Sequence, residues 1–311
     1  MGKLKILYST VDKKNYLHED KEYFKSELAK HSNVDVRFIT KGGHIKKLLD
    51  ELNFKPNFIY FDGLFNNQPI TGLRDCNIPV GILYHDLHSN QEKFKQLVKD
   101  YSAHLIFVHY RDYFLQHFPE FSHMYRWLPH FIHTPIFKDY KLDKDIDYLL
   151  MGATTEKHYP LRQKIANEMN GVNGFVHHIH PGYKYFSADA IKTALIGENY
   201  AKEINRAKIF FTDDSIYKFP IKKYTEVLGC NTLLLATDSQ ELKDLGFVDR
   251  KTFVEINDKN YFAKAQYYIK NDAERLHIAE NGYKMVRSRH TTEIRIHQFI
   301  QYILDYLNIQ L

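Results

Sequence analysis

The stretch AKIFFTDDSIYKFPIKKYTEVLGCNTLLLATD, residues 207–238, decides the fold of this chain. It begins with a β-prone run, Ile209 to Phe211, and it ends with a second apolar run, Thr232 to Ala236. About twenty residues separate the two runs, which suits a crossover helix between parallel strands. The stretch therefore predicts a β-α-β unit.

The helix expected within this unit has the features of an anion site. Pro220 suits its first turn, where a missing amide donor has no cost. The next two turns bring Lys222, Lys223, Tyr224 and Glu226. Free amides at a helix start, together with two lysines, favour an anionic ligand. The alternative is a solvated face on which Glu226 only pairs with the lysines, and spacing alone leaves both interpretations open.

Length and composition limit the number of domains, the class of partner and the compartment. A chain of 311 residues predicts two domains of about 150 residues, and 44% hydrophobic content supports full folding. The net charge of +5 comes from 43 basic and 38 acidic residues, so it permits an anionic partner such as a nucleotide, a polyanionic polymer or a membrane surface without requiring nucleic acid. The two cysteines, Cys76 and Cys230, exclude a disulfide framework and favour a reducing compartment.

The chain opens with the strand-like run KLKILYST instead of a secretory signal. No apolar run approaches the ~20 residues that are needed to span a bilayer. We therefore expect a cytoplasmic protein without a transmembrane segment.

The first half alternates between two kinds of pattern. Buried strands are predicted at Lys5–Tyr8, Val34–Ile39, Asn57–Phe61, Val80–Tyr84, His104–Val108 and Tyr125–Leu128. Helices are predicted at Lys21–Lys30, His44–Leu52, Gln91–Asp100 and Asp112–Phe118. This alternation is typical of an α/β fold with a parallel, doubly wound sheet.

A charged stretch without apolar periodicity, FKDYKLDKD at 137–145, separates this series from a second one. The second series has strands at Asp147–Met151, Gly174–His178 and Thr252–Ile256 and helices at Pro160–Met169 and Tyr200–Arg206, besides the β-α-β unit. Asp238 and Glu241 form a predicted capping box for one more helix. The last helix, Glu293–Leu307, carries an apolar stripe that must dock on another surface. We predict domains at 1–138 and 139–290, and a helix within 291–311 that packs back on the first domain.

Ligands of parallel sheets bind at the carboxyl ends of the strands, in a cleft when there are two such domains. In the first half, Val80–Tyr84 leads into His85 and Asp86. In the second half, the strand ends lead into Gly152, Thr154, His180 and Tyr183. These residues are the candidates for chemistry and binding.

The second half resembles the C-terminal domain of the GT-B glycosyltransferases, specifically the group-1 type and its spore-maturation (CgeB-like) branch. That family has a glycine loop after its first strand, a nearby arginine, a basic residue shortly before a glutamate, and a small-Cys-Gly turn before an apolar strand. The matching residues here are Gly152, Arg162, Lys223, Glu226 and the turn Gly229, Cys230 and Asn231. The resemblance implies a GT-B fold: two Rossmann-like doubly wound domains with an interdomain cleft, and a C-terminal helix that returns to the first domain.

The resemblance also implies roles for these residues. Glu226 would accept hydrogen bonds from the ribose of a nucleotide-sugar donor, and Arg162 and Lys223 would neutralise its diphosphate without a metal. We add Thr154, His180, Tyr183 and Tyr224 as predicted donor contacts. Two positions depart from the family pattern. The group-1 family has an earlier glutamate where this chain has Lys218, and a glycine where it has Asn231, a residue that also adopts the left-handed conformation.

The first half resembles the family through a His-Asp pair after its fourth strand and the segment Arg126–Pro129. In group-1 enzymes a histidine at such a strand end lies beside the transferred sugar. His85 and Asp86 are therefore our predicted catalytic residues.

The cluster of His177, His178 and His180 has to be weighed as a metal site, because imidazole is a common zinc ligand. His178 and His180 share a strand face, but no Cys, Asp or further His supports them at a suitable spacing. We predict no metal and no cofactor, since a nucleotide sugar is a substrate.

We thus expect a metal-independent glycosyltransferase that moves a sugar, with retention, from a nucleoside-diphosphate sugar to an acceptor that is a glycan, a protein, a small molecule or DNA. The alternatives are a non-catalytic nucleotide-sugar-binding protein, a sugar-nucleotide epimerase or phosphorylase, and a DNA-modifying glycosyltransferase. The base, the sugar, the acceptor and the oligomeric state are left open by the sequence.

Overall fold

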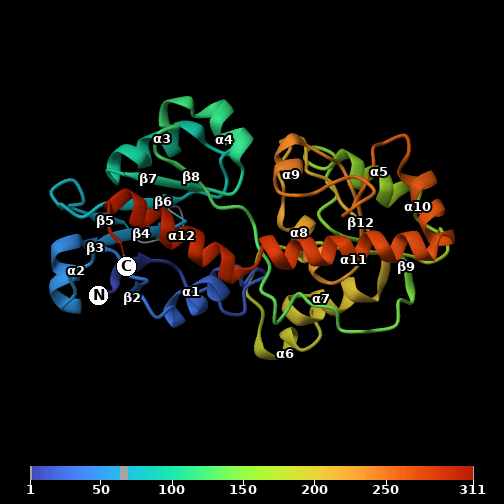
Figure 1. The fold of residues 1–311 in the computed structure, drawn as a ribbon, viewed down its shortest axis with the longest axis horizontal. Coiled ribbons are helices and arrows are strands. Elements are labelled where there is room, and N and C mark those ends of the chain that lie inside the picture. Colours follow the sequence, from blue (N-terminus) through green and yellow to red (C-terminus); the bar gives the residue numbers. More distant parts are fainter. Residues whose placement is uncertain (1, 64–68, 311) are drawn as a thin grey trace. The chain divides into compact units, whose positions relative to one another are not determined.

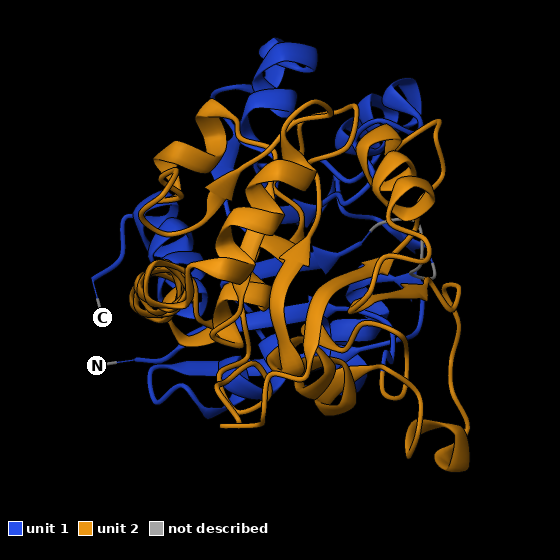
Figure 2. Ribbon diagram, turned by 90° about the vertical axis from the view of Figure 1, so that its right-hand side faces the viewer, with its two compact units in different colours: residues 1–13, 21–129, 295–311 blue, residues 14–20, 130–294 orange. Residues whose placement is uncertain are grey.

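The computed structural model describes residues 2–63 and 69–310 and divides the chain into two compact units. Unit 1 consists of Met1–Lys13, Lys21–Pro129 and Arg295–Leu311, and unit 2 of Lys14–Asp20 and His130–Ile294 (Figure 2). The sequence predicts boundaries after residues 138 and 290, whereas the units divide after residues 129 and 294. It does not predict that the short segment Lys14–Asp20 belongs to unit 2.

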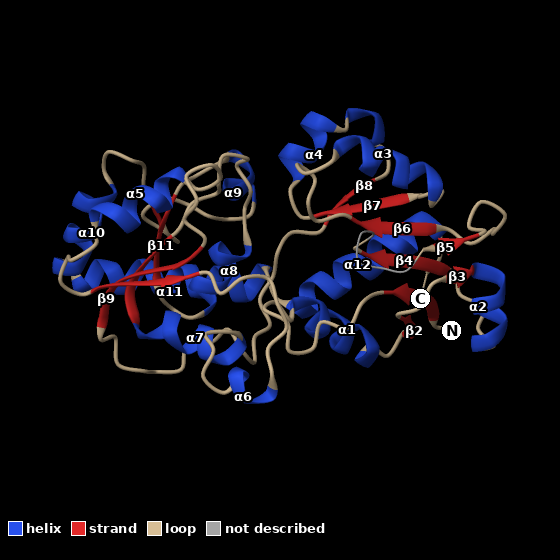
Figure 3. Cartoon of the chain, turned by 180° about the vertical axis from the view of Figure 1, so that it is seen from behind, coloured by secondary structure: helices blue, strands red, loops and turns tan. Residues whose placement is uncertain are grey.

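Unit 1 contains a parallel six-stranded sheet in the order β2-β1-β4-β6-β7-β8. Its strands are β1 (Leu4–Ser9), β2 (Val34–Ile39), β4 (Phe58–Asp62), β6 (Val80–Leu83), β7 (Leu105–Val108) and β8 (Tyr125–Trp127). A separate pair, β3 (Gly43–His44) and β5 (Ile70–Thr71), is not predicted from the sequence. The prediction of a parallel, doubly wound sheet is confirmed (Figure 3).

Helices cover both faces of this sheet because side chains alternate along each buried strand. The helices are α1 (Asp20–Lys30), α2 (Ile45–Leu52), α3 (Gln91–Asp100), α4 (Arg111–His117) and α12 (Thr292–Leu307), with a 3-10 turn at Pro119–Phe121. Ile59 and Phe61 of β4 join the core that contains Phe94 of α3. Tyr60 points to the opposite face, where its ring lies 4.8 Å from that of Phe299. Phe299 belongs to the C-terminal helix α12, which lies against this sheet (Figure 1).

The C-terminal helix α12 packs back on unit 1, as predicted. The ring of Phe299 also lies 5.5 Å from that of Phe24 on α1 and 5.0 Å from that of Phe107 on β7. Arg295 Nε donates to the carbonyl oxygen of Pro129 at 2.8 Å. The apolar stripe of the last helix therefore completes a core whose other parts come from the first third of the chain.

Unit 2 contains a parallel five-stranded sheet in the order β10-β9-β11-β12-β13. Its strands are β9 (Ile146–Gly152), β10 (Phe175–Ile179), β11 (Ala207–Phe211), β12 (Leu233–Ala236) and β13 (Val254–Glu255). After β9 the chain adds β10 on one side, and it then adds β11 and all later strands on the other side. The topological switch point of this sheet therefore lies between β9 and β11.

Seven helices are described in unit 2: α5 (Pro160–Glu168), α6 (Ala188–Ile191), α7 (Gly197–Arg206), α8 (Lys222–Gly229), α9 (Gln240–Asp244), α10 (Tyr261–Lys270) and α11 (Asp272–Arg289). The sequence did not predict α6, α10 or α11. None of the helices in the described part of the chain combines the length and apolar character of a membrane span.

Two predicted helix starts are wrong by one or two residues. The helix α8 begins at Lys222 after an extended Ile221, so Pro220 lies before the helix instead of in its first turn. The helix α9 is capped by Ser239, whose Oγ accepts a hydrogen bond from the amide of Leu242 at 3.2 Å. Asp238 instead accepts a hydrogen bond from the amide of Ser239, so it forms no capping box with Glu241.

Candidate functional site

The predicted donor-binding residues of unit 2 gather around the carboxyl ends of β9 and β11. The strand β9 ends at Gly152, and β11 runs into Thr212 and Asp213. In open parallel sheets, loops diverge at the switch point and leave room for a ligand there. This end of the sheet is therefore where a ligand of unit 2 is expected.

Arg162 joins the two loops at this point. Its side chain is 2% exposed, and its Nε lies 2.9 Å from Asp213 Oδ1. Its Nη2 donates to the Asp213 carbonyl oxygen at 2.9 Å and its Nη1 to that of Ala153 at 3.4 Å. The guanidinium lies 4.0 Å from the ring centroid of Tyr159. Because Asp213 balances its charge, Arg162 acts here mainly by fixing the loops that follow β9 and β11.

Lys223 lies against the same glycine loop. Gly152 has φ +118°, and a Cβ there would lie 3.0 Å from Lys223 Cε and 3.1 Å from Lys223 Nζ. A side chain at residue 152 would therefore displace the lysine, which explains the glycine. Burial and then the charge of Arg162 lower the pKa of Lys223 to about 8. Within the described residues Lys223 Nζ makes no hydrogen bond and no ion pair, so its charge is available to an anion.

Glu226 follows Lys223 on α8 by three residues and so lies on the same side of the helix. Its Oε2 accepts a hydrogen bond from the hydroxyl of Tyr200 on α7 at 3.3 Å. Burial raises the pKa of Glu226, although Lys222 and Lys223 oppose this shift. The group is a partly enclosed carboxylate beside cations, which is suited to accept hydrogen bonds from hydroxyl groups.

The loop after β10 brings two more predicted residues to this place. His180 Nδ1 accepts a hydrogen bond from the amide of Gly182 at 3.0 Å. The pKa of His180 is lowered by burial, then by Lys223 and Arg162, which places the imidazole close to both cations. The ring of Tyr183 lies 4.8 Å from that of His180, and its side chain is 72% exposed. Thr154 lies half-buried in the loop that follows Gly152.

Tyr224 is separated from this group. It is buried, and its hydroxyl donates to the carbonyl oxygen of Thr237 at 2.8 Å. Its ring packs against Phe247. Since its polar atom is already bonded inside the unit, the geometry does not support the predicted donor contact of Tyr224.

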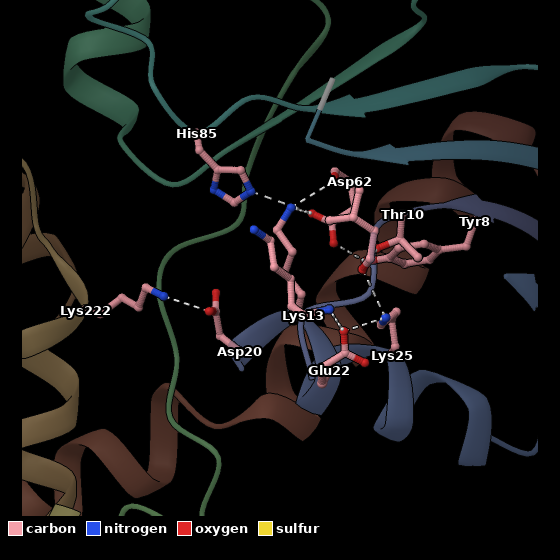
Figure 4. Close-up of polar contacts among 11 residues, drawn as sticks. Tyr8, Thr10, Lys13, Asp20, Glu22, Lys25, Asp62, His85 and Lys222 are labelled. Atoms are coloured by element: carbon pink, nitrogen blue, oxygen red, sulfur yellow. Dashed lines mark hydrogen bonds and ion pairs between the residues drawn. The ribbon is translucent and has the colours of Figure 1, made fainter. Parts of the chain in front are cut away.

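The sequence analysis missed two residues from the N-terminal part of the chain, His18 and Asp20. Asp20 Oδ1 lies 2.7 Å from Lys222 Nζ (Figure 4). The pKa of His18 is lowered by burial first and then by Lys222, and its ring lies 6.0 Å from that of Tyr183. About 200 residues separate this segment from α8, and no local pattern could have indicated the contact.

We call the segment Lys14–Asp20 the strap. It is held to the loop after β10 by main-chain hydrogen bonds, from Leu17 N to Lys184 O at 3.1 Å and from Phe186 N to Asn15 O at 2.8 Å. The rings of Tyr16 and Tyr185 lie 4.9 Å apart. The strap therefore forms part of the surroundings of His180 and Tyr183.

In unit 1, His85 follows the carboxyl end of β6, as predicted, and its side chain is 30% exposed. Its Nε2 lies 3.7 Å from Oδ1 of Asp62, the last residue of β4. The side chain of Asp86 is exposed, and its carbonyl oxygen accepts hydrogen bonds from the amide and hydroxyl of Ser89, both at 2.9 Å. Asp86 thus belongs to a turn, and the catalytic roles of both residues stay predictions.

The histidines after β10 have separate partners. His178 Nε2 lies 2.8 Å from Glu203 Oε1, whereas His180 bonds to its own loop. Among residues 2–63 and 69–310, no group of three or more His, Cys, Asp or Glu residues is arranged to hold a metal ion.

Comparison with known proteins bears on the fold and the class of protein. Residues 160–301, somewhat less than half of the chain, match a family model described as "Glycosyl transferase-like". None of the curated proteins matches the sequence.

Several solved structures are similar over nearly the whole chain. Sucrose-phosphate synthase from Thermosynechococcus elongatus has a TM-score of 0.71 at 14% identity, covering 98% of this chain and 100% of that one. A glycosyltransferase from Rickettsia africae has a TM-score of 0.66 at 10% identity, covering 100% of both chains. HepE from Anabaena, solved with UDP-glucose, has a TM-score of 0.65 at 10% identity, covering 97% and 99%. These likenesses show that the chain has the GT-B fold, and with the family match they support a glycosyltransferase.

Proposed function

We propose that this protein is a glycosyltransferase that transfers a sugar from a nucleoside-diphosphate sugar to an acceptor. The observation that carries the proposal is Lys223, a partly enclosed cation held against the glycine loop of Gly152. Among the described residues Lys223 makes no ion pair and no hydrogen bond, although Glu226 and Asp213 act on its charge. Departure of a nucleoside diphosphate develops negative charge, which such a cation stabilises.

Each residue of the site has a part in this reaction. Lys223 would bind the diphosphate, together with the first amide groups of α8. Arg162 would hold the two loops in place through Asp213. Glu226 would accept hydrogen bonds from the ribose, and His180 and Tyr183 would line the site. The resemblance to group-1 enzymes assigns His85 and Asp86 of unit 1 to the sugar in an oxocarbenium-like transition state.

Retention of configuration, independence of metal, membership of the spore-maturation branch and a cytoplasmic location stay predictions of the sequence. The chemistry of the site favours a reaction without metal, because side chains and amides supply the positive charge that a metal would otherwise provide. A product analysis by NMR would determine the anomeric configuration.

UDP-glucose is the first donor to test. Two of the similar structures, HepE and an alpha-glucosyltransferase, were solved with UDP-glucose. The second of these also contained DNA with an abasic site, so a DNA acceptor is an alternative for this chain. DNA binding by a protein with net charge +5 would weaken steeply with added salt, whereas a small acceptor would show little salt dependence.

Thermal shift and turnover test the proposal together. UDP-, GDP-, CDP-, ADP- and dTDP-sugars are added in turn, and the preferred one should raise the melting temperature, because a ligand that binds only the folded state stabilises it. Release of nucleoside diphosphate, with and without acceptors, distinguishes a transferase from a non-catalytic binder and from an epimerase. No shift with any nucleotide would refute the proposal.

Glu226→Gln tests the site itself. The variant should lose most of the ligand-induced shift, since an amide is a poorer acceptor for two ribose hydroxyls. Its melting temperature without ligand should be unchanged or slightly higher, because burial raises the pKa of Glu226 and disfavours its charged form in the fold. Glu198→Gln, at an exposed ion pair on α7, is the matched control and should keep the full shift.

A further inference from the structure

Unit 1 contains a buried charged group that the proposed function does not use. Asp62, at the end of β4, is 2% exposed and has contacts on both carboxylate oxygens (Figure 4). Lys21 Nζ lies 2.9 Å from Oδ1, and Tyr8 donates its hydroxyl to Oδ2 at 3.1 Å. Lys21 Nζ also donates to the main-chain oxygen of Asp62 at 2.9 Å. The carboxylate is therefore fixed in position and balanced by one cation.

This carboxylate lies at the switch point of its sheet. The strand β1 has β2 on one side and β4 on the other, so the order in which the chain adds strands reverses at β1 and the switch point lies between β1 and β4. Asp62 ends β4, and Tyr8 lies near the end of β1. Gly63, with φ +88°, leaves room for the side chains of Lys21 and His85. A Cβ at residue 63 would lie 2.8 Å from Lys21 Nζ and 3.7 Å from His85 Cδ2.

We propose that Asp62 and Lys21 are positioning residues for His85: the carboxylate holds the imidazole by its Nε2 edge, and the lysine limits how strongly the carboxylate favours the protonated ring. The inference rests on the proposed function insofar as His85 faces the sugar. The 3.7 Å separation between Asp62 Oδ1 and His85 Nε2 is an electrostatic contact, longer than a direct hydrogen bond.

Further titratable groups lie near His85 in the described part of the chain. His109, at the end of β7, has its ring 5.1 Å from that of His85, and its Nδ1 lies 2.7 Å from the carbonyl oxygen of Leu128. Tyr8 donates its hydroxyl to Asp62, and Asp86 is the neighbour of His85 in the chain. Although burial alone would raise the pKa of Asp62, Lys21 and His85 keep it below its ordinary value, so this carboxyl is an anion at neutral pH.

Two substitutions should move the pKa of His85 in opposite directions. Asp62→Asn removes the anion and leaves Lys21 uncompensated, so the pKa of His85 should fall by about one unit. Lys21→Met removes the cation and leaves the carboxylate uncompensated, so the pKa of His85 should rise by about one unit. Two residues that only support the fold would not shift the pKa of His85 in opposite directions.

Histidine titration by NMR on the full-length protein measures these shifts, with the His85 signal assigned by its loss in His85→Gln. The pH profile of kcat/KM for donor turnover should shift in the same direction as each titration. Asp100→Asn, at an exposed position on α3, is the control and should shift neither. Circular dichroism checks that each variant is folded. If Asp62→Asn is not folded, the expected rise in the pKa of His85 in Lys21→Met tests the proposal.

Shifts that are absent or of the same sign in both variants would overturn the proposal. Opposed NMR shifts without any movement of the kcat/KM profile would overturn it too, because His85 would then not take part in the reaction through this pair. Absence of donor turnover in the unmodified protein counts against the proposed function alone. In that case the NMR titration still decides whether Asp62 and Lys21 set the protonation of His85.

Discussion

Arg162 and Lys223 lie at the same end of the unit 2 sheet, but their charges are balanced differently. Arg162 is paired with Asp213 and bonded to two carbonyl oxygens, so its guanidinium is part of the fold. Lys223 has a depressed pKa of about 8 because it is enclosed and lies near Arg162. The resemblance to known enzymes assigns both residues to the diphosphate, whereas we propose that the binding charge is mainly that of Lys223.

Lys223→Met should separate binding from stability. Removal of a charge-assisted contact should weaken affinity for the nucleoside diphosphate by about tenfold or more, measured by calorimetry. The unbound variant should melt no lower than the unmodified protein. Between pH 8 and the ordinary lysine pKa, the folded state binds fewer protons than the unfolded state. The charged form of the enclosed lysine therefore lowers the free energy of unfolding at pH 7. The substitution removes this destabilising charge.

The same pKa gives the pH dependence of binding. A diphosphate prefers the protonated lysine, so affinity should decline as the pH rises through about 8, and this decline should be missing in Lys223→Met. Lys202→Met, at an exposed ion pair on α7, should retain both the affinity and the decline. Equal affinity in the Lys223 and Lys202 variants would remove Lys223 from the diphosphate site.

At the scale of elements, the contacts of the strap include two main-chain hydrogen bonds, the ring contact of Tyr16 with Tyr185, and the ion pair between Asp20 and Lys222. Because Lys222 precedes Lys223 on α8, the ion pair connects the strap to the helix that carries the binding charge. Asp20→Asn should speed hydrogen exchange at the amides of Leu17 and Phe186 by about fivefold or less, as expected for the loss of one partly exposed ion pair. Mass-spectrometric exchange measures this.

Asp189→Asn, which breaks an exposed ion pair with Lys192 on α6, provides the comparison and should leave the exchange of the strap unchanged. Unaltered exchange at Leu17 and Phe186 in Asp20→Asn would mean that the ion pair between Asp20 and Lys222 does not hold the strap.

The sequence could predict elements whose periodicity is strong. Buried strands such as β6 and β11 are short apolar runs between polar segments, and their positions follow from that pattern. Asn231 at φ +54° has the left-handed conformation that was expected of it. The helices α10 and α11 were not predicted, although both bury apolar residues in the unit 2 core.

Contacts between distant parts of the chain could not be predicted in this way. The pairs Asp20 with Lys222 and Asp62 with Lys21 depend on the order of strands in the sheets, and local patterns carry no information on that order. Lys218, where the group-1 family has a glutamate, lies 3.5 Å from Asp214 and has φ +58°, so it belongs to a turn of the loop after β11. The sequence also predicted a donor contact for Tyr224. The direction of this side chain depends on the fold, and local patterns do not determine it.

At the scale of the whole molecule, the chain passes between the two units after residues 13, 20, 129 and 294. Neither unit is therefore a single continuous piece of sequence. Unit 1 needs α12, because Phe299 covers Tyr60 and Phe107 on one face of its sheet. Removal of a buried aromatic contact of this kind costs about 3–5 kcal/mol, which is a large part of the stability of a domain.

We therefore expect a fragment of residues 1–129 to lack a cooperative urea transition and near-ultraviolet circular dichroism. A fragment in which a short flexible linker joins residue 129 to residues 292–311 should show both, because Arg295 bonds to the carbonyl oxygen of Pro129 and the two ends to be joined are adjacent. Phe299→Ala in the linked fragment is the matched control and should lower the midpoint or abolish the transition. If 1–129 alone unfolds cooperatively with the midpoint of the linked fragment, α12 is not part of the core that unit 1 needs in order to fold.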